Sequence, residues 1–456
     1  MTHHRTARRG RLVLLRLACF AVGFAVNLAT AATFTSNITI SETDTTYDDQ
    51  DIVIDGPVTV TVDGLHLFNS LLLTNGAVLT HSPCTVSETH KLDLTISDQI
   101  AISADSRIDV SGKGYLAGRT VGNVPAPASA FHSGGSYGGL GAWIAGSSTP
   151  LAVYGTYADP QEWGSGSGYV SGGGLIRLVA GSLELQGQLL ANGSNADGSG
   201  GAGGGIRVAV NALTGNGTMQ AKGGTSVYSN NYGGGGGGRI AVYAAEHSQF
   251  NLGNLSAAGA ASPRFPGGAG TVYVRDTDEA VGTLMIDAGS GGNGWTPWGV
   301  AGTNTFVIAD GVVIRGAQTQ VKPEHPGMVV EFAGGVEVSG GARLELEDAL
   351  LGGTTPLVLG TNSSMIFSGS VTSTAPVTIG GGTFTTERLV APALTLSNYS
   401  VLTHLPCTET NTHKLEINVT GAVVVDAMSR IDVSGRGYVA GRTVGNVPAP
   451  ASAFHS

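Results

Sequence analysis

Two imidazoles and one thiol occur together twice in this chain at the same spacing. The two sets are His81, Cys84 and His90, and then His404, Cys407 and His413. Histidine nitrogen and cysteine thiolate are preferred ligands of zinc and copper, so each set could supply three ligands to such a metal. No fourth ligand follows from either spacing. The alternative is that each set forms a turn before a strand and recurs through common descent.

Aromatic side chains are concentrated in one segment, residues 136–169, where six occur in 34 residues against 6% for the whole chain. They are Tyr137, Trp143, Tyr154, Tyr157, Trp163 and Tyr169. If exposed, these rings would form a platform for sugar rings. The alternative is that they cover the core beneath a long loop and supply apolar area. Trp295 and Trp298 belong to a second loop with the sequence GNGWTPWG.

Acidic side chains give no evidence for catalysis. A polysaccharide-cleaving enzyme needs two or three carboxylates gathered on one face, whereas residues 172–244 contain only Glu184 and Asp197. Asp159 and Glu162 could bind calcium, but they lack the spacing of a calcium loop. We therefore expect no catalytic residue and no cofactor. Calcium, zinc and the activities of polysaccharide lyases or glycoside hydrolases are the alternatives.

The candidate residues lie within a repeat of 323 residues. Segments 106–133 and 429–456 are identical at 26 of 28 positions, and the segments before them, 78–105 and 401–428, at 12 of 28. In the less similar part apolar residues are retained at every second position, as in strands with one buried face. The first copy continues after Ser133, whereas the sequence stops at Ser456. We therefore expect a fragment of a longer repetitive array.

A shorter repeat of about thirty residues predicts the architecture. Each unit has a glycine cluster, a strand, a turn and a second strand, and the equivalent apolar positions are Ile176, Ile206, Ile240 and Val272. Units of this length with two or three strands are typical of a β-solenoid. We expect a right-handed parallel β-helix in which glycines allow tight corners and positive φ.

A basic side chain also recurs in this shorter repeat. Arg177, Arg207 and Arg239 follow the glycine clusters. We expect them to occupy one position of the repeat and to form an outward-facing, solvated stack.

The N-terminus and the charge indicate an exported protein. Residues 1–31 combine a basic start, an apolar core and the sequence Ala29-Thr30-Ala31, as in a cleaved signal peptide. Without them the chain has 18 basic and 33 acidic residues, a net charge of −15. That charge argues against binding to nucleic acid or to an anionic membrane, and no membrane span is expected.

The motifs SRIDVSGRGY, GGSYGGLG, GGGLIRL and GGGGGRIAVY resemble the glycine-rich modules of large secreted or surface-exposed bacterial proteins. The resemblance covers residues 78–243 and 401–456. It implies an adhesin-like or structural role and assigns no catalytic residue.

The expected organisation has six parts: a signal peptide (1–31), N-terminal coils (32–110), a Gly/Pro/aromatic excursion (111–171), glycine-rich coils (172–280), further coils (281–390) and a truncated second repeat copy (391–456). We expect a secreted or cell-surface adhesin-like protein that binds an extracellular glycan or a cell-surface component through loops. The alternative function is an extracellular protein that binds or cleaves polysaccharide.

Overall fold

The computed structural model describes residues 31–227, 232–299 and 302–450. The predicted signal peptide, apart from Ala31, lies outside these residues. The expected all-β composition and parallel pairing are confirmed, because nearly every ladder is parallel. Helical structure in the described residues is confined to the short turns η1 (Val121–Asn123), η2 (Ala128–Ala130), η3 (Leu252–Asn254) and η4 (Val444–Asn446). None of the described helices is long and apolar enough to cross a membrane.

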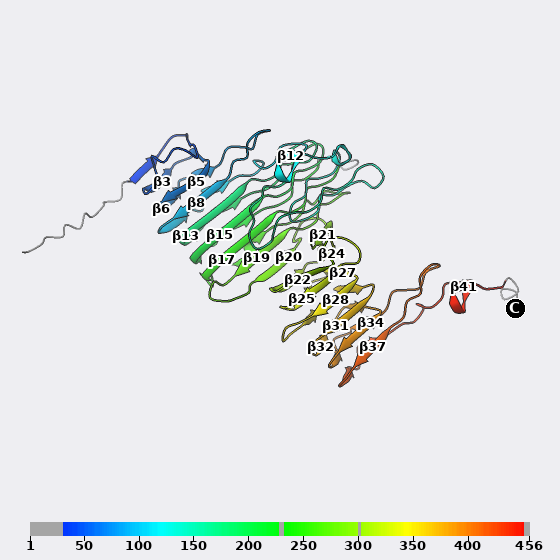
Figure 1. The fold of residues 1–456 in the computed structure, drawn as a ribbon. Helices are drawn as coiled ribbons and strands as arrows, with labels where there is room; N and C mark the ends of the chain where they lie inside the picture. The colour runs from blue at the N-terminus through cyan, green and yellow to red at the C-terminus, as the bar shows by residue number, and fades with distance from the viewer. Residues whose placement is uncertain (1–30, 228–231, 300–301, 451–456) are drawn as a thin grey trace, which may run out of the picture.

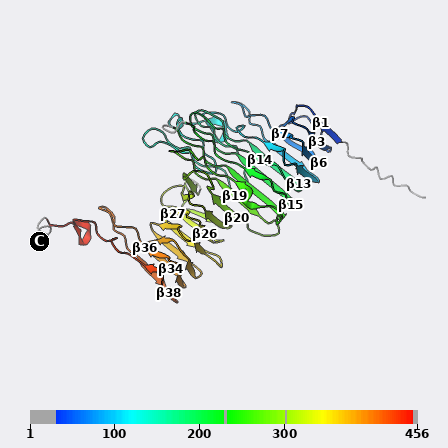
Figure 2. The same cartoon turned by 180° about the vertical axis from the view of Figure 1, so that it is seen from behind.

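The N-terminal strands form two facing sheets, which we call the first ladder (Figures 1 and 2). One sheet contains β1 (Ala31–Phe34), β3 (Asp51–Asp55), β5 (Gly64–Phe68), β6 (Ser70–Thr74), β8 (Leu92–Ile96), β9 (Gln99–Ile102), β13 (Leu175–Leu185), β15 (Gly205–Thr214), β17 (Arg239–Glu246) and β19 (Thr271–Arg275). The other contains β2 (Ile38–Ile40), β4 (Thr59–Val62), β7 (Val78–Thr80), β10 (Arg107–Asp109), β14 (Gln188–Leu190), β16 (Thr218–Gln220) and β18 (Leu255–Ser256). The chain passes repeatedly from the large sheet to the other and back, with β5 and β6, and β8 and β9, as consecutive strands of the large sheet.

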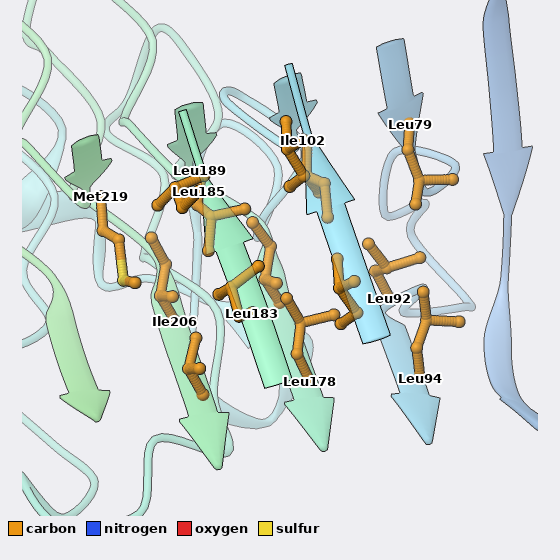
Figure 3. Close-up of a cluster of buried hydrophobic side chains, with 14 of the residues drawn as sticks. Leu79, Leu92, Leu94, Ile102, Leu178, Leu183, Leu185, Leu189, Ile206 and Met219 are labelled. Carbon is orange, nitrogen blue, oxygen red and sulfur yellow. The ribbon is translucent and has the colours of Figure 1, made fainter. Parts of the chain in front are cut away.

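The core of the first ladder consists of aliphatic side chains stacked in register. Ile176 pairs with Ile206, Ile206 with Ile240, and Ile240 with Val272. All four are buried, as the short repeat predicts. Figure 3 shows Leu92, Leu94, Leu178 and Leu183 from one sheet meeting Leu79 and Leu189 from the other.

A second ladder follows from residue 283. Its strands β20 (Thr283–Asp287), β23 (Gly311–Arg315), β26 (Val336–Ser339) and β29 (Leu357–Leu359) extend the large sheet. A second row contains β21 (Trp295–Trp298), β24 (Gln320–Pro323), β27 (Arg343–Leu346), β30 (Ser364–Phe367), β33 (Thr383–Thr385), β36 (Val401–Thr403) and β39 (Arg430–Ile431). A third contains β22 (Thr305–Ile308), β25 (Val329–Phe332), β28 (Asp348–Leu351), β31 (Ser370–Ser373), β34 (Arg388–Ala391) and β37 (Glu416–Val419), and a fourth contains β32 (Val377–Ile379), β35 (Leu394–Leu396) and β38 (Val423–Val425).

The two ladders meet where strand direction reverses. β19 and β20 pair antiparallel, with Tyr273 opposite Leu284. Val272 and Val274 pack into the core of the first ladder, whereas Tyr273 and Leu284 pack into the core of the second. The shared sheet therefore has a core on each of its faces at this junction. If the second ladder is related to the first by a half-turn about the axis along which the strands stack, its strands run in the opposite direction and its core lies on the opposite face of the shared sheet.

The long repeat appears in three dimensions as equivalent strands. β5 to β10 correspond to β34 to β39 at the constant offset of 323 residues. Upstream of Val78 identities at this offset are sparse, but the equivalent burial pattern begins two strands before β7 and β36, at β5 and β34. The hairpin of β11 (Arg119–Thr120) and β12 (Val124–Pro125) likewise recurs as β40 (Arg442–Thr443) and β41 (Val447–Pro448).

Candidate functional site

Four excursions leave the first ladder and return to it, and each is closed at its base by an equivalent hydrogen bond. The backbone N–H of the last residue donates to the carbonyl of the first, at 2.7 to 2.9 Å. The pairs are Gly174 with Val110, Gly204 with Ala191, Gly238 with Ala221, and Gly270 with Ala257. We call the described arms of these excursions the glycine bundle; they gather along one edge of the ladder (Figures 1 and 2).

The glycines of the bundle are required by close backbone approach. Gly203 donates to the carbonyl of Gly236, and Gly237 to that of Gly268. A Cβ placed on Gly203 would lie 2.1 Å from a carbonyl oxygen, and one on Gly237 would lie 1.8 Å from another. Neither residue has a positive φ. The expectation that these clusters serve tight corners and positive φ is therefore wrong here, although it is correct for turn glycines such as Gly76.

Part of the longest excursion, residues 154–163, lies across the outer face of the large sheet; we call it the strap. Oδ1 of Asp159 lies 3.0 Å from both Arg177 and Arg207. The hydroxyl of Tyr243 donates to the carbonyl of Ala158 at 2.6 Å. Burial would raise the pKa of Asp159, but hydrogen bonds from Gln161 and Arg177, with the charges of both arginines, together lower it.

Arg239 does not belong to the stack expected from the sequence. Arg177 pairs in register with Arg207, but Arg207 pairs with Ala241. Arg239 is buried and donates to the carbonyl of Tyr154 and to the Thr271 hydroxyl. The expectation of a solvated stack is therefore wrong, because the strap covers this face of the sheet and the arginines fasten it.

Three of the six predicted aromatic residues are structural supports of the excursion. Tyr137 is fully buried. The Tyr154 hydroxyl donates to the carbonyl of Trp163 at 2.6 Å, and Nε1 of Trp163 donates to the carbonyl of His90 at 2.6 Å. Burial raises the pKa of both tyrosines. These three rings connect parts of the excursion and its base and are not available as a platform.

The acidic residues around the strap are held by tyrosines. Glu162 accepts a hydrogen bond of 2.5 Å from Tyr115. Asp310 accepts from Tyr157 at 2.6 Å and from Tyr273 at 3.0 Å. Burial and the bond to Asp310 raise the pKa of Tyr157. Tyr157 therefore ties the excursion to the second ladder, and both carboxylates have a structural contact.

Trp143 and Trp295, from the two tryptophan-containing segments, both lie beside one lysine of a neighbouring strand. Nζ of Lys322 lies 5.8 Å from the ring centre of Trp143 and 5.5 Å from that of Trp295. Lys322 is in β24, opposite Pro297 of β21. The two indoles line a groove of about 260 Å³ together with Arg264, Phe265, Pro266 and Asn293, among others. We call this the tryptophan groove; both indoles are partly exposed in it.

Tyr169 belongs to a second aromatic surface at the tip of the glycine bundle. Its ring centre lies 4.9 Å from Phe131 and 5.1 Å from Tyr232, and His132 lies 5.5 Å from Tyr232. Phe131 and Tyr169 are 48% and 37% exposed. We call these four residues the tip cluster. Of these four residues, Phe131 and His132 could have been named as candidates from the sequence, because they lie at the end of the nearly identical repeat segment 106–133.

The first histidine and cysteine set forms a closed turn. Nδ1 of His81 lies 2.6 Å from the carbonyl oxygen of Ser82, and Nε2 accepts a hydrogen bond from the amide of Leu175 at 3.2 Å. Burial lowers the pKa of His81 to about 4, so the ring is neutral. Burial raises the pKa of Cys84 to about 11. Both ring nitrogens of His81 are thus already engaged.

The second set repeats this turn. Nδ1 of His404 lies 2.6 Å from the carbonyl oxygen of Leu405, and the sulfur of Cys407 accepts from the backbone amide of His413. The His413 ring contacts Glu387. Within the described ranges no three His, Cys, Asp or Glu side chains are arranged to hold a metal ion. The cysteines are free, and their sulfur contacts run to the backbone of the following histidine.

Comparison with protein-family models, with curated proteins and with solved structures found no match for this chain.

Proposed function

We propose that this chain is a secreted or cell-surface, adhesin-like structural repeat protein of bacterial origin that binds an extracellular glycan through its loops. The leader-like N-terminus and the acidic charge support export, and the long repeat supports a structural, adhesin-like role. The tryptophan groove is the observation that carries the binding function.

The proposed scaffold is a right-handed parallel β-helix. It is supported by parallel ladders in register and by the regular order in which the chain visits the sheets. Crossover connections between parallel strands are right-handed in almost all proteins, which favours that hand. Because strand direction and core side reverse together at β19 and β20, both ladders would have the same hand.

The groove has the chemistry of a glycan site. Two partly exposed indoles line the groove with Arg264, and Lys322, which lies against both indoles outside the residues that line the groove, adds positive charge beside it in a strongly acidic chain. Ligand sites commonly combine aromatic walls with a few polar groups. We therefore expect glycans with carboxylate or sulfate groups to bind best, and added salt to weaken their binding.

Binding of a glycan panel to the full chain tests this function. Trp143→Ala and Trp295→Ala should each weaken binding about tenfold, which corresponds to about 1.4 kcal/mol. Lys322→Met should weaken only the binding of acidic glycans. Tyr169→Ala in the tip cluster is the matched control and should bind normally. Weakening by Tyr169→Ala alone would place binding at the tip, and no binding by the intact chain would refute the proposal.

We propose no catalytic activity. Asp159, Glu162 and Asp310, the carboxylates at the strap, are held by arginines or tyrosines and contribute to packing. The full chain should release no reducing or unsaturated sugar from a polysaccharide panel. Release that stops on replacing one Asp or Glu would favour the alternative of a polysaccharide-cleaving protein.

A further inference from the structure

The two copies of the long repeat place the same side chains in different surroundings. In the first copy Tyr115 is 1% exposed, whereas its equivalent Tyr438 is 46% exposed. The same difference separates the buried apolar residues of β9, of β10 and of the loop that follows β10 from their exposed equivalents in and after β38 and β39. The pairs are Ile100 and Val423, Ile102 and Val425, Ile108 and Ile431, and Val110 and Val433. A core surface of the first copy is thus an exposed surface of the second.

The cause of the difference is a segment that covers only the first copy. β8 and β9 pair with β13, and β10 pairs with β14. The glycine-rich arm 164–174 lies against the loop after β10, where the amide of Tyr115 donates to the carbonyl of Gly164 and its carbonyl accepts from the amide of Gly172. Among the described residues, β37, β38 and β39 of the second copy pair with the preceding strands β34, β35 and β36 and with no following strand. We call their uncovered side, with the loop 433–441, the acceptor face.

The loop of the acceptor face has the same local contacts as the first-copy loop against which the arm 164–174 packs. Lys113 donates to the carbonyl of His81, and Arg436 donates to that of His404. Asn123 and Asn446 bridge equivalent carbonyls of the preceding turn. The loop therefore has its first-copy conformation even though no segment of the described residues lies over it. In both views it projects from the end of the molecule near β41 (Figures 1 and 2).

The hydrogen-bonding groups of this loop are arranged for the same partner. In the first copy Gly114 donates to the carbonyl of Gly172 at 2.8 Å, and Gly118 donates to that of Ser167 at 2.6 Å. The amides of Val110, Gly112 and Tyr115 are also hydrogen-bonded in the first copy. Within the described part of the chain, the second-copy equivalents of these five amides make no hydrogen bond; they are those of Val433, Gly435, Gly437, Tyr438 and Gly441. Nε2 of His81 accepts from Leu175, whereas Nε2 of His404 receives no such donor among the described residues.

We propose that the acceptor face binds a module segment of the type formed by residues 164–190, a glycine-rich arm followed by a parallel strand pair. The arm would meet the free amides of the loop, and the strands would cover β37, β38 and β39. Parallel strand addition at a sheet edge supplies main-chain hydrogen bonds, and alternating apolar side chains set its register. Gly437 is specific for this occupant, because its equivalent Gly114 has no room for a Cβ beside Gly173.

The test extends the full chain by a copy of residues 134–282 placed after Ser456. Val425→Cys reports on the acceptor face, and Ile102→Cys, at the equivalent first-copy position, is the matched control. Thiol labelling is read for each peptide by mass spectrometry. The extension should slow labelling of Val425→Cys at least tenfold, and Gly437→Ala should restore it. Unchanged labelling at Val425→Cys while Ile102→Cys stays protected would overturn the proposal.

A second measurement uses the chain without an extension. Amides of β37 to β39 should exchange with deuterium at least tenfold faster than those of β8 to β10, at every protein concentration. Equal protection in dilute solution would overturn the proposal. Protection that appears only as concentration rises would also overturn it, in favour of a second copy of this chain as the occupant. Neither measurement involves a glycan, so its result is independent of the proposed binding function.

Discussion

Asp159 and Arg177 form a contact of 3.0 Å between the long excursion and the outer face of the large sheet. The same carboxylate contacts Arg207, one strand further along the sheet. One acidic side chain therefore fixes the strap to two neighbouring strands. The segment that carries Trp143 precedes the strap and has its own attachment, since Ala142 accepts a backbone hydrogen bond from Gly134 and donates one to Gly234.

Replacing Asp159 with Asn should loosen the strap without unfolding the ladder. The lost contacts are partly exposed, and such ion pairs contribute about 1 kcal/mol or less each. We expect faster deuterium exchange or proteolysis within residues 154–163 and a small change in melting temperature. Asp287→Asn, which breaks an exposed pair with Arg315 away from the strap, is the control. Equal protection of the strap in both variants would contradict this role.

Gly114 and Gly437 are the same repeat position, yet alanine should act differently at the two. A Cβ on Gly114 would lie 2.1 Å from the carbonyl oxygen of Gly173, whereas a Cβ on Gly437 would have no heavy atom within 4 Å. Forced overpacking costs about 1–3 kcal/mol, and exposed substitutions change stability by about 0.5 kcal/mol or less. Denaturant unfolding should show a loss only for Gly114→Ala. Equal losses would mean that close packing is not the reason for the glycine.

The stacked positions of the first ladder could be predicted from sequence because each strand there has one buried face. Ile176, Ile206, Ile240 and Val272 recur at the spacing of one coil and pair in register. The reversal at β20 could not be predicted in this way. β19 is buried at four consecutive positions beginning at Thr271, but β17 has the same pattern beginning at Arg239 and pairs parallel with β19, so the loss of alternation does not mark the reversal.

The tryptophan groove could be predicted only in part. Trp143 was among the candidate residues, but Trp295 is far from it in sequence, and only the stacking of the ladders brings both to Lys322. The roles of Trp163 and Tyr137 could not be read from composition, because an aromatic residue in a long loop fits either a platform or a buried support. Whether such a residue is exposed or buried depends on its neighbours, and those neighbours come from distant segments of the chain.

His81 should make stability depend on pH. Its pKa is about 4 in the folded chain and near 6.5 when unfolded, because burial disfavours the charged ring. As pH falls from 6.5 to 4 the unfolded state takes up a proton that the folded state does not, so stability declines, by about 3 kcal/mol in all. Urea unfolding at pH 7 and pH 4 should show this loss, and His81→Gln should reduce it by that amount. An unchanged pH dependence in the variant would be inconsistent with a buried neutral imidazole.

Cys84 should be inert toward thiol reagents in the folded chain. The thiolate is the reactive form, and burial raises the pKa of this thiol to about 11, so about one molecule in a thousand is ionised at pH 8. The sulfur is also buried in the turn before β8. Iodoacetamide at pH 8 should modify Cys84 only as fast as the chain unfolds, and modification in urea should be fast. Fast modification of Cys84 while the chain remains folded would contradict this prediction. It would show that the turn opens and that the thiol is accessible to a metal ion.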